Sequence, residues 1–130
     1  MARKVLVVDD SVVNRKLASV LLAREGWQSV EAEDGASAFV ALQEHNDIEI
    51  VLLDISMPDL SGEDVCRRLR AEPRTAQLPI IAYTAHALIE EHDHFIAIGF
   101  DAILVKPINL ASLQQAMIKV QAARPARAQP

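Results

Sequence analysis

Val5-Leu6-Val7-Val8-Asp9-Asp10, near the start of the chain, is a short apolar run that stops at two acidic residues. Three later apolar runs also stop at a polar residue: residues 50–53 at Asp54, residues 80–83 at Thr84, and residues 103–105 at Lys106. Short runs of this kind are typical of strands buried on both faces of a parallel sheet. In such sheets ligands bind beyond the carboxyl ends of the strands. We therefore expect these side chains to meet in one pocket, suited to a divalent cation and a phosphoryl group.

Amphipathic segments alternate with these strands. We expect a first helix that ends near Gly26 and whose apolar face carries Val13, Leu17, Val20, Leu21 and Leu22. A more polar strand over residues 27–32 is typical of a sheet edge. Further helices are expected around residues 36–42, from Val65 past Leu69 to Pro73, over residues 86–98, and from an N-cap at Asn109 through Val120. Five repeats of strand and helix indicate a doubly wound α/β fold, with helices on both faces of a five-stranded parallel sheet.

The composition bounds the class of protein. With 130 residues, 51% of them apolar, the chain is long enough for one domain with a substantial core. No apolar stretch approaches the roughly 20 residues of a membrane span. The net charge of −5 argues against non-specific binding to nucleic acid. A single cysteine, Cys66, excludes an internal disulfide, so we expect a cytoplasmic protein in which Cys66 fills the core.

Taken together, Asp9-Asp10, Asp54, Thr84 and Lys106-Pro107 resemble the receiver domain of two-component response regulators. The resemblance covers residues 3–122 and includes the phrases Leu53-Asp54-Ile55-Ser56-Met57-Pro58, Ser61-Gly62 and Tyr83-Thr84-Ala85. It implies the flavodoxin-like strand order 2-1-3-4-5 and a cis peptide bond before Pro107. Residues 123–130 lie beyond it and are expected to form a disordered tail, so we expect no second, output domain.

The resemblance assigns a role to each residue of this constellation. Asp54 is the expected phosphoacceptor, because carboxylates can form aspartyl phosphates. Asp10, Asp54 and the backbone carbonyl of Ser56 are expected to ligate Mg²⁺, with Asp9 acting mainly through water. Lys106 would direct its charge, and Thr84 its hydroxyl, toward the phosphoryl group. Because phosphoryl transfer needs mainly positioning and charge neutralisation, no general base is required. We expect a phosphoacceptor signalling domain rather than an enzyme, with self-catalysed phosphorylation and dephosphorylation only.

Each residue alone has a simpler interpretation. An aspartate after a strand, such as Asp10, is most often a helix N-cap, the threonine alone would be a capping hydroxyl, and the lysine alone would be solvated. These explanations would have to account for four coincident strand ends at once, which favours the pocket. His45, His92 and His94 show no spacing typical of a zinc site, and we expect them to be solvated.

The chain departs from the family pattern beside the expected pocket. Receivers often carry an aromatic residue three positions before the lysine, where this chain has Ile103. An aromatic side-chain switch of the usual form is therefore not expected. Tyr83 should point to the opposite face from Thr84, as a packing residue beneath a helix. By resemblance, Ser56 and His86 would tune the access of water to the phosphoryl group.

Several functions remain open from the sequence. The first is phosphorelay signal transduction by a free-standing response regulator, which Met1 close before the first strand supports. The same motifs also fit the receiver of a hybrid sensor kinase. A haloacid-dehalogenase-type phosphatase is disfavoured, because such enzymes carry Asp-x-Asp after the first strand and this chain has adjacent Asp9-Asp10. A phosphorylation-independent scaffold would leave the constellation unused.

The partners follow from the leading interpretation. The donor would be a histidine kinase or a histidine phosphotransfer domain, which would meet the first helix. A downstream protein would bind the face formed by the helix over residues 86–98, the strand over residues 102–105 and the helix over residues 109–120. We expect a monomer or weak dimer, with neither nucleic acid nor membrane as a partner.

Overall fold

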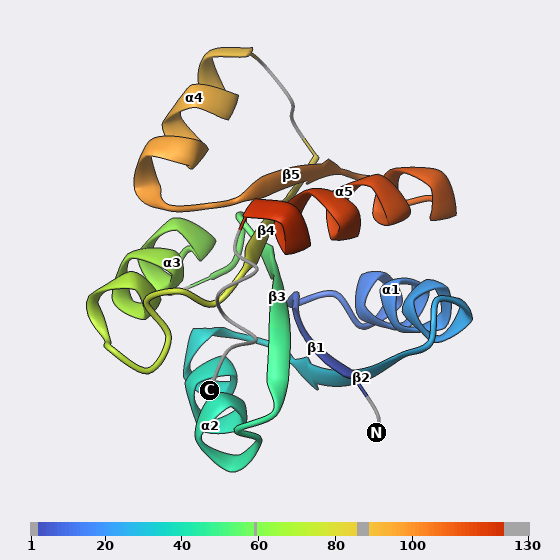
Figure 1. The fold of residues 1–130 in the computed structure, drawn as a ribbon, viewed down its shortest axis with the longest axis horizontal. Coiled ribbons are helices and arrows are strands. Elements are labelled where there is room, and N and C mark those ends of the chain that lie inside the picture. The colour runs from blue at the N-terminus through green and yellow to red at the C-terminus, as the bar shows by residue number, and fades with distance from the viewer. Residues whose placement is uncertain (1–2, 59, 86–88, 124–130) are drawn as a thin grey trace.

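The computed structural model describes residues 3–58, 60–85 and 89–123. Its centre is one parallel sheet whose strands follow the order β2-β1-β3-β4-β5 (Figure 1). The strands are β1 (Arg3–Val8), β2 (Trp27–Ala32), β3 (Ile48–Asp54), β4 (Ile80–Thr84) and β5 (Ala102–Val105). The doubly wound fold and the strand order expected from the sequence are both confirmed. Because all the strands run in the same direction, their carboxyl ends meet at one edge of the sheet.

Helices cover both faces of this sheet. One face carries α1 (Val12–Arg24) and α5 (Leu110–Ala123), and the other carries α2 (Gly35–Glu44), α3 (Gly62–Ala71) and α4 (Ile89–Ile98) (Figure 1). The start expected for the fourth helix, at residues 86–88, lies outside the described residues. No described helix is both long enough and apolar enough to cross a membrane.

The last helix begins where the sequence predicts. The backbone N–H of Ser112 donates to Oδ1 of Asn109 at 2.9 Å, which confirms the expected N-cap. The helix buries Leu113, Met117 and Val120 and extends through Ala123, one residue past the expected domain limit. The remainder of the expected tail, residues 124–130, lies outside the described residues.

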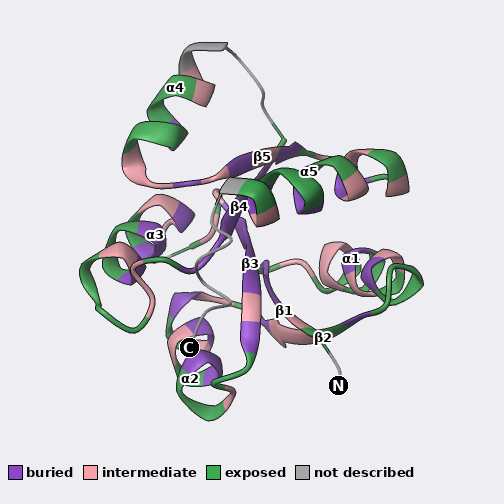
Figure 2. Cartoon of the chain, in the orientation of Figure 1, coloured by how far each residue is buried: buried purple, intermediate pink, exposed green. Residues whose placement is uncertain are grey.

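Successive residues of β3 alternate between the two faces of the sheet, which explains the continuous apolar run. Val51 and Leu53 belong to the buried cluster under α2, α3 and α4, whereas Ile50 and Leu52 belong to the cluster under α1 and α5. Figure 2 shows buried residues concentrated along the central strands and on the inward sides of the helices. Cys66 is buried in the first cluster, as expected. Burial of each large aliphatic side chain contributes roughly 1.5–3 kcal/mol to the stability of the fold. The buried sheet therefore fixes the positions of the strand ends.

The apolar face of α1 differs from the expectation. Leu22 is buried, but Val13 is 71% exposed, Val20 55% and Leu17 40%. The small residue Ala18, one turn before Leu22, takes the position that faces the sheet. Two apolar stripes run along this helix, and helical periodicity alone does not decide which of them meets the sheet. The stripe formed by Val13, Leu17 and Val20 therefore faces solvent, and we call it the α1 stripe.

Candidate functional site

Three aspartates meet beyond the carboxyl ends of β1 and β3. The two strands are neighbours with Val8 opposite Leu53, so the residues that follow, Asp9 and Asp54, come side by side. One carboxylate oxygen from each of Asp9, Asp10 and Asp54 lies within 4.8 Å of the others. Asp9 and Asp54 are buried, and Asp10 is exposed. Within the described part of the chain, this is the one group of three acidic, histidine or cysteine side chains placed to hold a metal ion.

Lys106 reaches the same group from the end of β5. Its Nζ lies 3.1 Å from Oδ1 of Asp54 and 3.2 Å from Oδ2 of Asp9. Its backbone N–H donates to the carbonyl oxygen of Thr84 at 2.8 Å. The peptide bond between Lys106 and Pro107 is cis, as expected. The site thus presents one ammonium group to three carboxyl groups, which leaves an excess of negative charge.

Burial and this charge imbalance shift the pKa values of Asp54 and Lys106. Burial, and next the charge of Asp9, raise the pKa of Asp54 although Lys106 opposes the shift. Burial lowers the pKa of Lys106, but the contacts with Asp54 and Asp9 outweigh it and the pKa is raised overall. The ammonium therefore stays charged at neutral pH. Crowded carboxylates of this kind favour a hard cation that relieves their repulsion.

Backbone groups orient the two buried aspartates. The N–H of Ser11 donates to Oδ1 of Asp9 at 2.8 Å, and the N–H of Ser56 donates to Oδ1 of Asp54 at 3.2 Å. The loop after β3 is closed by Gly62, whose N–H donates to the carbonyl of Ile55 at 3.1 Å. A Cβ on Gly62 would overlap the carbonyl oxygen of Asp54. The loop can fold this close to the strand end only because this residue is glycine.

Arg15 contacts the end of β1, where Asp9 lies, and the sequence does not predict this contact. Its Nη1 donates to the backbone carbonyl of Asp9 at 2.7 Å, and its Nε contacts Oε1 of Glu31 at 3.2 Å. An arginine in an amphipathic helix is ordinarily solvated, so nothing in its own segment marks it. The signal that could have found it is Glu31, an acidic residue within a strand.

The residues flanking the site lie on both sides of the sheet. Thr84 ends β4 and is buried, and His86 lies outside the described residues. Tyr83 packs in the cluster under α1 and α5, as strand alternation predicts. Its ring also lies beneath Lys106, with Nζ 4.8 Å from the ring centroid, a contact that was not expected. Ile103 packs against the opposite cluster, in the place where receivers often carry an aromatic ring.

The histidines differ in exposure: His94 is exposed, as expected, whereas His45 and His92 are half-buried. Nε2 of His94 lies 2.6 Å from Oε2 of Glu63, which joins α4 to α3. Nδ1 of His45 lies 3.4 Å from Nζ of Lys4. Nε2 of His92 is buried and has no hydrogen-bond partner among the described residues. The expectation is confirmed for His94, which stays exposed, and is wrong only for the half-buried His45 and His92, because the spacing of histidines does not reveal how the helices pack.

A family model for the response regulator receiver domain matches residues 5–118. This chain belongs to that family. The receiver is 39% identical over 113 residues to sensor histidine kinase RcsC of Salmonella typhi. That match covers 87% of this chain and 12% of the kinase, so the receiver spans only a small part of the length of this relative.

Solved structures show the same fold. The TM-score with chemotaxis protein CheY4 of Vibrio cholerae is 0.85 at 28% identity, covering 92% of this receiver and 99% of that chain. The receiver domain of sensor histidine kinase PA1611 from Pseudomonas aeruginosa gives a TM-score of 0.80 at 27% identity, covering 92% and 98%. That structure has a magnesium ion coordinated in its active-site cleft.

The family places this receiver in phosphorelay signalling, and the matches lend no support to the phosphatase alternative. A chemotaxis protein, sensor histidine kinases and a hybrid signal transduction histidine kinase occur among the similar proteins. The two arrangements that the sequence left open, a free-standing regulator and a receiver within a kinase, therefore both remain.

Proposed function

We propose that Asp54 accepts a phosphoryl group from a phosphohistidine of a histidine kinase or histidine phosphotransfer domain. An oxygen of the Asp54 carboxylate attacks phosphorus, and the bond between phosphorus and the histidine nitrogen breaks. The nitrogen keeps the electron pair and takes up a proton, and the product is an aspartyl phosphate. The observation that carries this proposal is the Lys106 ammonium, 3.1 Å from Asp54. It supplies positive charge where phosphoryl oxygens would arrive, and phosphoryl transfer depends mainly on such positioning and neutralisation.

The acidic group fits a Mg²⁺ ion. Its three carboxylates bring oxygens within 4.8 Å of one another, and Lys106 balances only part of their charge. Asp10, Asp54 and the backbone carbonyl of Ser56 would be the direct ligands. Asp9 would act mainly through water, which agrees with its contact to the lysine. When bound, the ion would neutralise charge shared between the carboxylates and the phosphoryl oxygens.

The remaining steps need few groups. Lys106 would turn from the Asp54 carboxylate to the phosphoryl oxygens, and the Thr84 hydroxyl would donate to one of them. Water would later hydrolyse the acyl phosphate, with its access tuned by Ser56 and His86. The receiver, residues 3–122, would therefore catalyse only its own phosphorylation and dephosphorylation.

The donor would approach the α1 stripe. This helix begins at Val12, two residues after Asp10, so its first turn lies next to the pocket. Val12 itself is 54% exposed and extends the stripe toward the site. Contiguous apolar side chains that face solvent mark protein contacts. An apolar helix face on the donor could cover the stripe while its histidine reaches Asp54.

A downstream protein would bind the face made by α4, β5 and α5. Among the side chains that the structure describes on these elements, three exposed large aliphatic residues stand out: Ile96 on α4, Val105 on β5 and Ile118 on α5. Thr84 and Lys106, at the ends of β4 and β5, connect this face to the pocket. We assign the receiver to the cytoplasm as a monomer or weak dimer that passes its signal through this surface.

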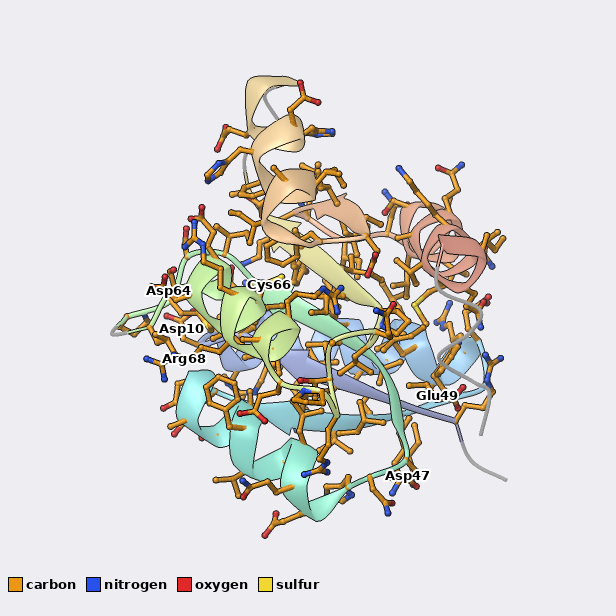
Figure 3. All side chains as sticks on the ribbon, turned by 60° about the vertical axis from the view of Figure 1, so that its left-hand side comes forward. Asp10, Asp47, Glu49, Asp64, Cys66 and Arg68 are labelled. Carbon is orange, nitrogen blue, oxygen red and sulfur yellow. The ribbon has the colours of Figure 1, made fainter. Side chains whose placement is uncertain are left out.

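Labelling by acetyl phosphate with Mg²⁺ tests the phosphoacceptor. Intact-mass spectrometry should show one added phosphoryl group on the wild type and none on Asp54→Asn. Asp47→Asn is the matched control, because Asp47 lies at the opposite end of the sheet, near Glu49, and its side chain is 52% exposed (Figure 3). It should be labelled like the wild type. Labelling of Asp54→Asn equal to that of the wild type would refute the assignment of Asp54 as the phosphoacceptor.

A further inference from the structure

Tyr83 occupies the sheet position between the strands that carry Asp54 and Lys106. β4 lies between β3 and β5, and in this register Tyr83 stands opposite Asp54 on one side and opposite Leu104 on the other. Lys106 follows Leu104 by two residues and so shares its face of the sheet. To reach Asp54 from the end of β5, the lysine side chain has to cross over Tyr83.

The tyrosine ring contacts the crossing lysine. Nζ of Lys106 lies 4.8 Å from the ring centroid, within the range of about 6 Å over which an ammonium is attracted to an aromatic face. Tyr83 is 1% exposed and belongs to the same buried cluster as Leu52 and Leu104. The ring therefore has little freedom to move. The attraction is strongest where, as here, the ring is shielded from water.

The ring is a neutral partner for the ammonium. Burial raises the pKa of Tyr83 to about 12, and the charges of Asp9 and Asp54 act in the same direction, so the hydroxyl stays protonated at neutral pH. Unlike the two aspartates, the aromatic face takes no conventional hydrogen bond from the ammonium. It also does not change when a phosphoryl group arrives, whereas Asp54 loses its carboxylate charge on becoming an acyl phosphate.

We propose that Tyr83 is a positioning residue whose ring face holds the Lys106 ammonium over the site while Asp54 carries a phosphoryl group. This inference rests on the phosphoacceptor role proposed above for Asp54. Before phosphorylation, two carboxylates suffice to place the ammonium. Afterwards one carboxylate is gone, and the ring contact persists and leaves the ammonium donors for the phosphoryl oxygens. An aliphatic side chain would fill the core here but has no negative ring face.

Two substitutions separate the ring from its packing role. Tyr83→Phe keeps the aromatic face, and Tyr83→Leu keeps only an apolar side chain. Leu113→Ala is the control, because Leu113 belongs to the same buried cluster but stands on α5. The probe is beryllofluoride with Mg²⁺, titrated at a temperature where unfolding curves show every variant folded. We expect Tyr83→Phe to bind within about twofold of the wild type and Tyr83→Leu to bind about fivefold or more weakly. Leu113→Ala should bind like the wild type despite its lower stability.

Ring-current shifts give a second readout that packing alone would not move. In NMR spectra, the Lys106 methylene protons next to Nζ should be shifted upfield in the wild type and in Tyr83→Phe, with and without the probe, but not in Tyr83→Leu. Three results would each overturn the inference: wild-type affinity in Tyr83→Leu, equal losses in both variants, or no upfield shift in the probe-bound wild type. A wild type that neither binds the probe nor takes label from acetyl phosphate would instead overturn the phosphoacceptor proposal.

Discussion

At the scale of single residues, Asp10 differs from the other two acidic residues of the site because it is exposed. As a proposed direct ligand, it should control the response to metal. Mg²⁺ at about 100 times its Kd should raise the free energy of unfolding of the wild type by about 2.7 kcal/mol. Asp10→Ala should lose most of this gain and take label slowly. Thermal unfolding with and without Mg²⁺, together with calorimetric titration, measures the effect.

An acidic residue outside the site provides the control for this experiment. Asp64 stands on α3, its side chain is 50% exposed, and it pairs with Arg67. Asp64→Ala should keep the full response to Mg²⁺. An unchanged Mg²⁺ affinity in Asp10→Ala would refute the ligand role.

Gly62 fixes the backbone beside the proposed phosphoacceptor. A Cβ here would overlap the carbonyl oxygen of Asp54 and lie 2.9 Å from Cα of Ile55, so Gly62→Ala forces the strand end or the loop to move. Overpacking of this kind costs about 1–3 kcal/mol. We expect both a lower free energy of unfolding and slower labelling by acetyl phosphate, because the displaced backbone carries Asp54.

Gly26→Ala separates these two effects. The φ of 83° at Gly26 strains an alanine, but nothing lies within 4 Å of the added Cβ. This variant should lose about 1–2 kcal/mol of stability and keep the wild-type labelling rate. If Gly62→Ala labels as fast as Gly26→Ala, its backbone contact has no role in the site.

The sequence predicts where the acidic residues and the lysine lie, but not everything that orients them. Each of Asp9, Asp54 and Lys106 directly follows an apolar run, and parallel strands bring such positions to one edge. The roles of Tyr83 beside Lys106 and of Arg15 beside Asp9 could not be assigned in this way. Their contacts depend on how side chains cross between elements that are distant in sequence, which neither periodicity nor spacing encodes.

At the scale of elements, Arg70 ties α3 to the segments that lead into β4 and β5. Its guanidinium donates to the carbonyls of Leu78 at 2.6 Å and Gly99 at 2.7 Å and to Oδ2 of Asp101 at 2.9 Å. The side chains of Arg70 and Asp101 are only 14% and 7% exposed. Arg70→Met should therefore lower the free energy of unfolding by about 3 kcal/mol or more, because it leaves a buried carboxylate and carbonyls short of donors. Urea unfolding measures this loss.

A second arginine on the same helix provides the comparison. Arg67 pairs with Asp64 at 3.1 Å, but their side chains are 53% and 50% exposed. Exposed pairs of this kind contribute about 0–1 kcal/mol. Arg67→Met should accordingly change stability by less than about 1 kcal/mol. Similar losses in the two variants would show that burial of the Arg70 network is not what stabilises α3.

For α1, the sequence predicts the helix but not the face that packs on the sheet. Its existence and its end at Gly26 follow from the sequence, since periodicity and a terminal glycine mark them. Its orientation does not follow, because Ala18 and Leu22 compete with the α1 stripe as the apolar face. Packing buried Ala18 and Leu22 and left Val13, Leu17 and Val20 in solvent. That outcome makes the helix a candidate contact for a partner.

At the scale of the whole molecule, two kinds of information predicted the fold. Apolar runs alternating with amphipathic segments were enough for a parallel sheet covered on both faces. The strand order came only from resemblance, because right-handed crossovers are compatible with several orders. The observed order puts β3 at the centre of the sheet, between β1 and β4. Asp54 thereby lies between the strand that precedes Asp9 and the one that ends at Thr84.

This arrangement predicts which parts of the molecule change when Asp54 is phosphorylated. A phosphoryl group adds negative charge and strong acceptors near Thr84 and Lys106, and the segments after these residues lead to α4 and α5. With Ile103 in place of an aromatic ring, we expect the response to consist of small loop shifts rather than one large side-chain rotation. It would be a population shift, limited by the difference in free energy between the two states.

Amide chemical shifts with and without beryllofluoride and Mg²⁺ measure this response. Perturbations should extend from Asp54 through Thr84 and Lys106 to α4, Ile103 and α5, while α2, which packs on β1 and β2, changes little. Asp54→Asn under the same additions is the control and should show no perturbation of α4 or α5. If the perturbations in the wild type stay within a few residues of Asp54 and never reach α4 or Ile103, the α4, β5 and α5 face is not a phosphorylation-controlled surface. A downstream partner would then have to recognise the pocket edge itself.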